Sequence, residues 1–250
     1  MGRKAVKLLI GLSLAMAITP QDAAGSEHQI GGRTAEVVFA RPKVASVARA
    51  ACEGDEAWVK RGVAAGVSPD SRGLEDFTLL NWAISCGNER GVEALLEAGA
   101  QPNHTFGHSY SAILFAVQVA SPQILQALLR HGGSPNAVDL ESSKSALELA
   151  LSRGLHGGGW EPYELLLKSG ADVNQASEAG NTIATWAATL GRFDKVKQLL
   201  DLGYRYDLNF LGLLAQVNDA EPTPTSDRLE VLAKLKDLGV KFPVVSTFKR

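Results

Sequence analysis

Apolar residues recur with helical spacing ahead of a series of glycines. Counting back from each of Gly99, Gly132, Gly170 and Gly203, positions −7, −4 and −3 are apolar. Such positions form one stripe along a helix, and a glycine fits the left-handed position that ends a helix. The pattern predicts a helix before each glycine, with these stripes: Val92, Leu95 and Leu96; Leu125, Leu128 and Leu129; Tyr163, Leu166 and Leu167; Val196, Leu199 and Leu200.

A further helix is predicted ahead of each of these four helices. A hydroxyl residue that can cap a helix precedes an apolar segment, and an alanine follows it five residues later, which lets neighbouring helices approach closely. The caps are Thr78, Ser111, Ser145 and Thr182, and the alanines are Ala83, Ala116, Ala150 and Ala187. Each unit therefore reads as helix, tight turn, helix and extended turn. No such unit buries its apolar stripe alone, so the units must stack.

The unit length is regular: Gly66, Gly99 and Gly132 are 33 residues apart, and Gly203 follows Gly170 by 33. With a T-P-L-H-like start and a "GADVN" end, the unit resembles the ankyrin repeat. The resemblance covers about residues 42–242. It implies an all-α ankyrin-repeat solenoid of about six helix-turn-helix units with atypical terminal caps, assigned to residues 42–250.

The chain departs from the ankyrin pattern at two positions of each unit. Leu79, Ala112, Ala146 and Ile183 replace the family's proline, and Asn81, Leu114, Glu148 and Thr185 replace its histidine. These departures remove hydrogen bonds that the family uses between repeats, so we expect modest stability. Two insertions, Arg153–Pro162 and Asn218–Asp227, lengthen connections, and insertions in solenoids often map to loops on the binding side.

The N-terminal segment, residues 1–25, predicts a secretory signal peptide. Arg3, Lys4 and Lys7 precede an apolar run from Leu8 to Ile18, and Ala15-Met16-Ala17 suits cleavage. The run is shorter than the roughly 20 residues that span a bilayer, which disfavours a retained anchor. We expect export to a bacterial periplasm, with residues 26–41 as a linker or N-terminal cap and no membrane span in the mature chain. The exact cleavage site stays open.

Charge and motifs argue against several function classes. The chain has 25 basic and 27 acidic residues, so it lacks the basic surface that nucleic acids require. "GHSYS" at 107–111 and "HGGGW" at 156–160 resemble the nucleophile elbow and oxyanion loop of hydrolases. However, the loop follows the elbow instead of preceding it, and Ser111 replaces the elbow's last glycine. His104 and His108 flank a turn without a third ligand. We predict no enzyme activity, no metal and no cofactor.

The two cysteines and one repeated, mostly aromatic position each have two interpretations. Cys52 and Cys86 lie 34 residues apart; because packed helices are about 8–10 Å apart, this spacing favours two buried free thiols over a disulfide. Trp82, Phe115, Leu149 and Trp186 share one repeated slot. A ligand-stacking stripe is conceivable there, but core packing between repeats is favoured.

The resemblance also implies where a partner binds, since ankyrin relatives use turn tips and the adjoining helix faces. Aromatic residues at these tips would be anchors, with tucked-back staples as the alternative for Phe77 and Tyr110. Trp160, in the longer connection, is a separate anchor candidate. The candidate contacts are Arg72, Leu74, Glu75 and Phe77; Thr105, Phe106, His108 and Tyr110; Leu140, Glu141 and Lys144; Trp160; and Glu178 and Asn181.

Small exported ankyrin proteins of this kind resemble immunity proteins that neutralise an interbacterial toxin, including phospholipase effectors of type VI secretion. The resemblance implies a periplasmic, monomeric protein that binds and occludes a protein partner. The alternative is a periplasmic scaffold that supports or protects another enzyme.

Overall fold

The computed structural model describes residues 28–107, 110–119, 121–217 and 225–244. The expected signal peptide and most of the second insertion lie outside these residues. The chain divides into two compact units, unit 1 up to Ser169 and unit 2 from Gly170 onward, and each is described by itself.

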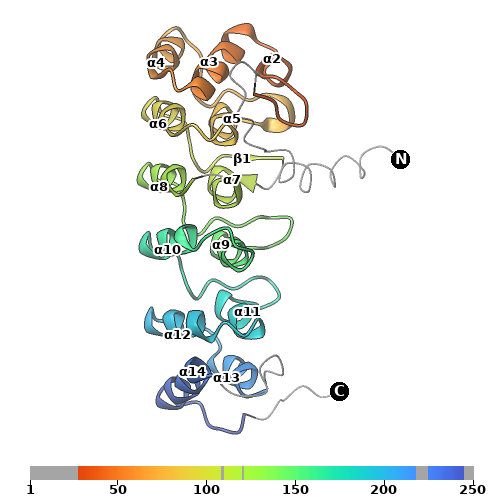
Figure 1. Cartoon of the computed structure of the whole chain (residues 1–250). Coiled ribbons are helices and arrows are strands. Elements are labelled where there is room, and N and C mark those ends of the chain that lie inside the picture. The colour runs from red at the N-terminus through yellow and green to blue at the C-terminus, as the bar shows by residue number, and fades with distance from the viewer. Residues whose placement is uncertain (1–27, 108–109, 120, 218–224, 245–250) are drawn as a thin grey trace, which may run out of the picture. The chain divides into compact units, whose positions relative to one another are not determined.

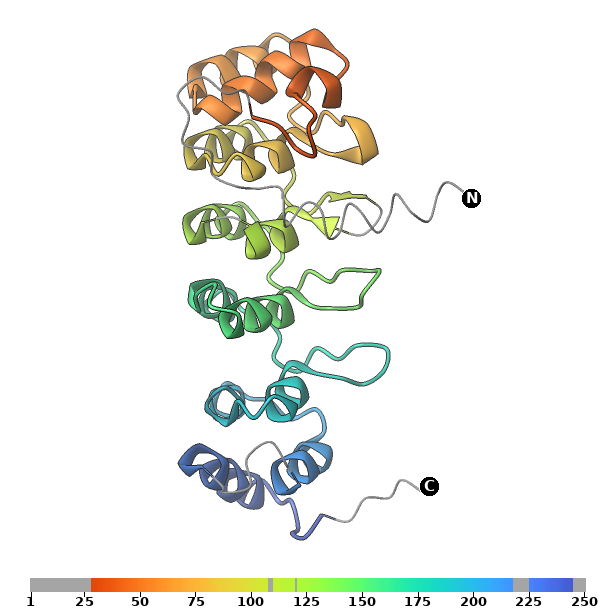
Figure 2. The same cartoon turned by 45° about the vertical axis from the view of Figure 1, so that its right-hand side comes forward.

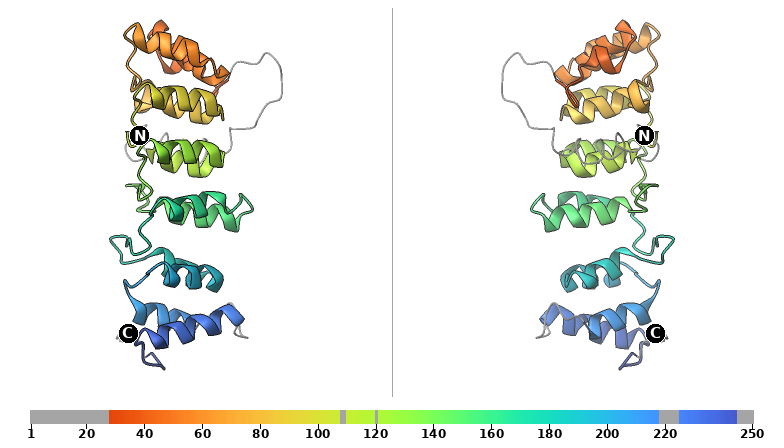
Figure 3. Two further views of the ribbon diagram at one scale, coloured as in Figure 1. Left: turned by 90° about the vertical axis from the view of Figure 1, so that its left-hand side faces the viewer. Right: turned by 90° about the vertical axis from the view of Figure 1, so that its right-hand side faces the viewer.

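Unit 1 consists of helix pairs that stack in two layers (Figures 1 and 3). The inner layer contains α3, α5, α7 and α9, and the outer layer contains α4, α6, α8 and α10. The short α2 packs against α3. The helices are α2 (Ala35–Val38), α3 (Pro42–Glu53), α4 (Glu56–Ala64), α5 (Leu79–Ser85), α6 (Glu89–Glu97), α7 (Ala112–Val119), α8 (Pro122–Arg130), α9 (Ala146–Leu155) and α10 (Glu161–Lys168).

Three hairpin-like turns connect the helix pairs of unit 1. The first contains a 3₁₀ turn, η1 (Leu74–Asp76), and the second contains the strands β1 (Thr105–Phe106) and β2 (Tyr110–Ser111). β1 and β2 pair antiparallel, with Thr105 opposite Ser111.

Unit 2 repeats the two-layer arrangement. α11 packs on α13, and α12 packs on α14. The bounds are α11 (Ile183–Thr189), α12 (Phe193–Asp201), α13 (Leu208–Gln216) and α14 (Ser226–Asp237). Among the described residues of both units, no helix combines the length and apolar character that crossing a bilayer would take.

The predicted helix ends are confirmed. The repeated glycines all have left-handed backbones, with φ from 85° at Gly170 to 97° at Gly203. The Thr78 hydroxyl accepts from the backbone N–H of Asn81 at 3.2 Å. Ser145 and Thr182 form complete capping boxes with Glu148 and Thr185. The four predicted alanines are buried.

The repeated aromatic slot belongs to the core in two repeats. Trp82 and Phe115 are buried on α5 and α7, which confirms core packing there. Leu149 and Trp186 are half-buried.

The replacement of the family's histidine leaves one buried amide unpaired. Neither the Oδ1 nor the Nδ2 atom of Asn81 has a hydrogen-bond partner in the part of the chain that the structure describes, although the residue is buried. Glu148 and Thr185, at the same position of later repeats, use their side chains in the capping boxes instead.

The prediction of two free thiols is wrong, because Cys52 and Cys86 form a disulfide with a Cα–Cα distance of 5.3 Å. Cys52 lies in the last turn of α3, and Cys86 directly follows α5. Helix spacing describes the separation of axes. Because Cα atoms lie about 2.3 Å from the axis, facing Cα atoms approach much more closely than the axes do.

Candidate protein-binding surface

The hairpins of unit 1 lie on the same side of its helix layers (Figure 2). Backbone bridges close their roots: Arg72 pairs with Thr78, and Val138 pairs with Ser145. Each root ends at the residue that caps the next inner helix. The tips are therefore anchored to the core through short, paired backbone segments.

The aromatic residues of the first two hairpins turn inward. Phe77 and Phe106 are buried, at 8% and 6% exposure, and their rings meet edge to face at 5.0 Å. Phe106 also meets Phe115 at 5.6 Å and Tyr110 at 5.9 Å. The expectation that Phe77 and Phe106 present their rings to a partner is therefore wrong. Burying two large rings stabilises the hairpin roots more than exposing them would.

Tyr110 takes an intermediate position. Its side chain is half-buried, and burial together with the nearby Asp139 carboxylate raises the pKa of its phenol. Asp139 belongs to the third hairpin, so Tyr110 lies near that hairpin as well as in its own. His108, predicted beside Tyr110, lies outside the described residues.

The exposed apolar residues at the tips are leucines. Leu74 on the first hairpin is 45% exposed, and Leu140 on the third is 70% exposed. Glu75, Thr105 and Glu141 are exposed as well. These predicted residues lie on neighbouring hairpins of unit 1 and are accessible to a partner.

Polar contacts connect the tips to one another. Arg72 lies 3.8 Å from the Asp76 carboxylate and donates to the carbonyl of Thr105 at 3.3 Å. Glu75 pairs with Arg33 at 3.5 Å, and its carbonyl accepts from the backbone N–H of Gly107 at 3.0 Å. Exposed ion pairs contribute little stability. The hydrogen bonds from Arg72 to the Thr105 carbonyl and from Gly107 N to the Glu75 carbonyl join the first hairpin to the second.

The tips contain strained backbone that the sequence does not predict. Glu75, Asp76 and Ser143 have φ of 57°, 60° and 56°, a region that residues with a Cβ atom rarely occupy. Each costs of order 1–3 kcal/mol, and such strain clusters at functional sites. No residue type in these turns signals it, since glycine would be the usual choice.

Lys144 and Trp160 are less accessible than predicted for contact residues. Lys144 is half-buried at the root of the third hairpin, where its carbonyl accepts from Asp139 N at 2.9 Å. Trp160 is also half-buried; its ring meets Tyr163 at 5.9 Å and covers Gly154. Because Trp160 follows α9 whereas the third hairpin precedes it, these two sites lie at opposite ends of that helix (Figure 3).

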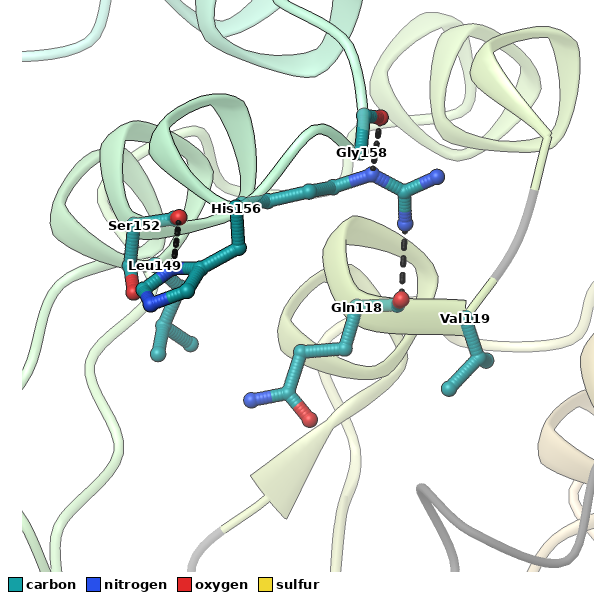
Figure 4. Close-up of a pocket in the computed structure, with 7 residues that line it drawn as sticks. Gln118, Val119, Leu149, Ser152, His156 and Gly158 are labelled. Atoms are coloured by element: carbon teal, nitrogen blue, oxygen red, sulfur yellow. Dashed lines mark hydrogen bonds between the residues drawn. The ribbon is translucent and has the colours of Figure 1, made fainter.

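The first insertion is clamped by an arginine (Figure 4). Arg153 donates to the carbonyl of Gly158 at 2.8 Å, and to those of Val117 and Gln118, at the end of α7, at 2.9 and 2.7 Å. A shallow hollow of about 540 Å³ opens beside it, next to the exposed His156. Through Nε and Nη1, Arg153 ties the loop to the end of α7. Ser109, the nucleophile of the elbow-like motif, lies outside the described residues.

Unit 2 carries the remaining predicted contacts on its own hairpin. Glu178 and Asn181 are exposed, and the hairpin closes by the bridge between Ala176 and Thr182. Two hydrogen bonds hold this turn. Asn181 N donates to the Ser177 hydroxyl at 3.1 Å, and Ser177 N donates to the Asn181 carbonyl at 2.8 Å.

No family model matches the chain, and a search of curated proteins finds no match. Solved structures do match. One is the human ASB11 ankyrin repeat domain, to which the chain is 24% identical with a TM-score of 0.51, over 79% of this chain and 85% of that one. The likeness agrees with the helix pairs, glycine-ended helices and hairpins described above. The chain therefore has the all-α fold of an ankyrin-repeat solenoid.

Proposed function

We propose that the chain is a protein-binding module whose partner docks on the hairpin tips of unit 1. The observation that carries this proposal is the exposure of Leu74 and Leu140, at 45% and 70%, on hairpins with buried or backbone-paired roots. Single exposed leucines are ordinary. Leu74 and Leu140 differ from an ordinary exposed leucine because the turns that carry them are fixed by backbone pairing at their roots and contain residues with positive φ. A pre-ordered surface loses little conformational entropy on binding.

The charges around the leucines favour a partner with a basic face. Asp76 and Glu75 at the first tip are partly neutralised by Arg72 and Arg33. Glu141, beside Leu140, makes no salt bridge among the described residues. An exposed, unpaired carboxylate beside an apolar side chain can steer a basic surface and speed association.

We further propose that residues 1–25 direct export to the periplasm. There the monomeric protein would act as an immunity protein that occludes a secreted antibacterial effector such as a phospholipase. The leader-like sequence supports export. Removing residues 1–25 takes away Arg3, Lys4, Lys7 and Asp22 and leaves 22 basic against 26 acidic residues, a net charge of −4, which agrees with a basic partner surface. Fusing residues 1–25 to a reporter that is active only outside the cytoplasm tests export, and an inactive reporter would contradict it.

Affinity capture from the native cell, followed by measurement of the purified complex, tests the surface. The Leu74→Ser/Leu140→Ser variant should bind the captured partner at least about 30-fold more weakly, the equivalent of about 2 kcal/mol. Leu202→Ser is the matched control, because Leu202 is 52% exposed but lies on unit 2. Unchanged affinity of the double variant would remove this surface from consideration.

The partner's own activity decides between immunity and support of an enzyme. An immunity protein inhibits its partner at equimolar concentration, and its deletion makes cells sensitive to the toxin. A scaffold instead sustains its partner's activity. A partner that keeps or gains activity in the complex would contradict the immunity proposal while leaving the binding surface intact.

A further inference from the structure

Three segments far apart in the sequence converge on one side-chain cluster in unit 1. His28 precedes α2, Cys52 lies in the last turn of α3 and Cys86 follows α5. Their ligand atoms, one imidazole nitrogen and two sulfurs, all lie within 4.8 Å of one another, and each residue is half-buried. The cysteines form the disulfide, so its reduced form would place two thiols beside an imidazole.

The imidazole of His28 is held in place by two neighbours. Its Nε2 atom lies 3.1 Å from the Ser85 hydroxyl, and its ring meets Trp82 edge to face at 5.2 Å. Ser85 donates its only hydroxyl proton to the Trp82 carbonyl at 2.6 Å, so it accepts a hydrogen bond from His28. The resulting tautomer carries its proton on Nε2 and leaves the Nδ1 lone pair available to a ligand.

We propose that the reduced cluster binds a thiophilic d¹⁰ cation, with Zn²⁺ as the representative ion, through the thiolates of Cys52 and Cys86 and the imidazole of His28. A phosphine or dithiol reductant supplies two electrons and the solvent two protons, converting the disulfide to two thiols. The cation then displaces both thiol protons, because thiolates are the ligand form.

The geometry fits such a chelate. Metal–sulfur and metal–nitrogen distances of about 2.3 and 2.0 Å in tetrahedral coordination place ligand atoms about 3.3–3.8 Å apart. The three ligand atoms now lie within 4.8 Å of one another. In the chelate the two sulfurs, which are bonded in the disulfide, move apart to about 3.8 Å, and the imidazole nitrogen moves toward them. Two sulfurs and one imidazole form a soft donor set, which favours Zn²⁺ and Cu⁺ over oxygen-seeking cations. An exchangeable ligand such as water would complete the fourth position of Zn²⁺.

The competing interpretation is a structural disulfide against which a histidine packs. It predicts no metal binding in either redox state. The two interpretations are separated by reducing the full chain with a phosphine, removing the reductant without oxygen, and titrating Co²⁺ as a spectroscopic stand-in for Zn²⁺. We expect one Co²⁺ per chain, thiolate-to-cobalt charge-transfer absorption, and loss of that absorption when Zn²⁺ is added. The oxidised protein should show no charge-transfer absorption when Co²⁺ is added.

Variants assign the ligands. His28→Ala should weaken Co²⁺ binding at least tenfold, and Cys52→Ser should abolish the charge-transfer band of a two-thiolate site. His156→Ala is the matched control, because His156 is an exposed histidine of unit 1 whose Nδ1 atom lies 2.7 Å from the Ser152 carbonyl. Absence of the band in the reduced wild type, or equal affinity of His28→Ala and wild type, would overturn the proposal.

Loss of the disulfide could itself unfold unit 1, so circular dichroism of the reduced chain accompanies the titration. A reduced chain that gains helicity on adding Zn²⁺ would support the site, since metal binding then drives folding. A reduced chain that stays unfolded with Zn²⁺ present would count against it.

Discussion

The side-chain amide of Asn103 donates to the carbonyl of Gly132, in the following repeat, at 2.8 Å. The same amide accepts from the backbone N–H of Ser134 at 2.8 Å. Asn174 makes the same pair of bonds in unit 2, to Gly203 O and Arg205 N, at 3.1 and 2.6 Å. The asparagine that recurs four residues after a repeat glycine is therefore a link between consecutive repeats. These links supply hydrogen bonds between repeats despite the missing family histidine.

Replacing Asn103 by alanine should lower the free energy of unfolding of unit 1 by about 1–3 kcal/mol, because two hydrogen bonds worth about 0.5–1.5 kcal/mol each are lost. Asn103→Asp should cost less, since its carboxylate still accepts from Ser134 N as Asp70 does from Gln101 N at 2.8 Å. Urea denaturation measures both. Gln123→Ala, at an exposed position of α8, is the control. Equal stability of Asn103→Ala and this control would refute the link.

Asn81→Leu should leave unit 1 as stable as the wild type or stabilise it by about 1 kcal/mol. The Asn81 amide is buried without a hydrogen-bond partner among the described residues, so leucine of similar volume removes an uncompensated desolvation cost. Leu114 already occupies the equivalent position of the next repeat and is fully buried.

Glu148→Leu is the contrasting variant for this test. Glu148 is also buried, but its carboxylate accepts from Ser145 N at 2.7 Å to complete the capping box. Glu148→Leu should therefore lower the free energy of unfolding of unit 1 by about 1 kcal/mol or more. If Asn81→Leu destabilises as much as Glu148→Leu in thermal denaturation, then the Asn81 amide has a role that the contacts above do not include.

Local periodicity made most of the fold predictable. Helical stripes, glycines with left-handed backbones and hydroxyl caps depend on neighbours within one turn, so the sequence alone indicates them. The inward turn of Phe77 and Phe106 depends on a ring in another helix, Phe115. No pattern near either residue distinguishes a buried ring from an exposed one. The strained turn at Glu75 likewise makes contacts with distant residues, Arg33 and Gly107.

Reducing the Cys52–Cys86 disulfide in metal-free buffer should destabilise unit 1 by about 3–4 kcal/mol. The bridge closes a loop of 34 residues, and removing it restores the conformational entropy of the unfolded chain. Denaturation curves with and without a phosphine reductant measure the loss. The Cys52→Ser/Cys86→Ser variant should match the reduced protein and be insensitive to the reductant. A reductant effect below about 1 kcal/mol would show that packing, and not the bridge, holds α3 against α5.

Tyr204 should make the stability of unit 2 depend on alkaline pH. Its ring is fully buried, its hydroxyl lies 3.0 Å from the Thr182 hydroxyl, and burial raises its pKa. In the unfolded chain the phenol ionises near pH 10, whereas in the fold it stays protonated to higher pH. The stabilisation is therefore fully present below about pH 10 and is lost as the pH rises through the folded-state pKa.

Tyr204→Phe tests this pH dependence. At about pH 7 it should lower the free energy of unfolding by about 1 kcal/mol, because the hydrogen bond to Thr182 is lost. Phenylalanine cannot ionise, so the difference from the wild type should shrink as the pH approaches about 11. Tyr206→Phe is the control, since Tyr206 is 52% exposed. Thermal unfolding across this pH range measures the difference, and a constant gap would mean that Tyr204 ionises alike in the folded and unfolded chain.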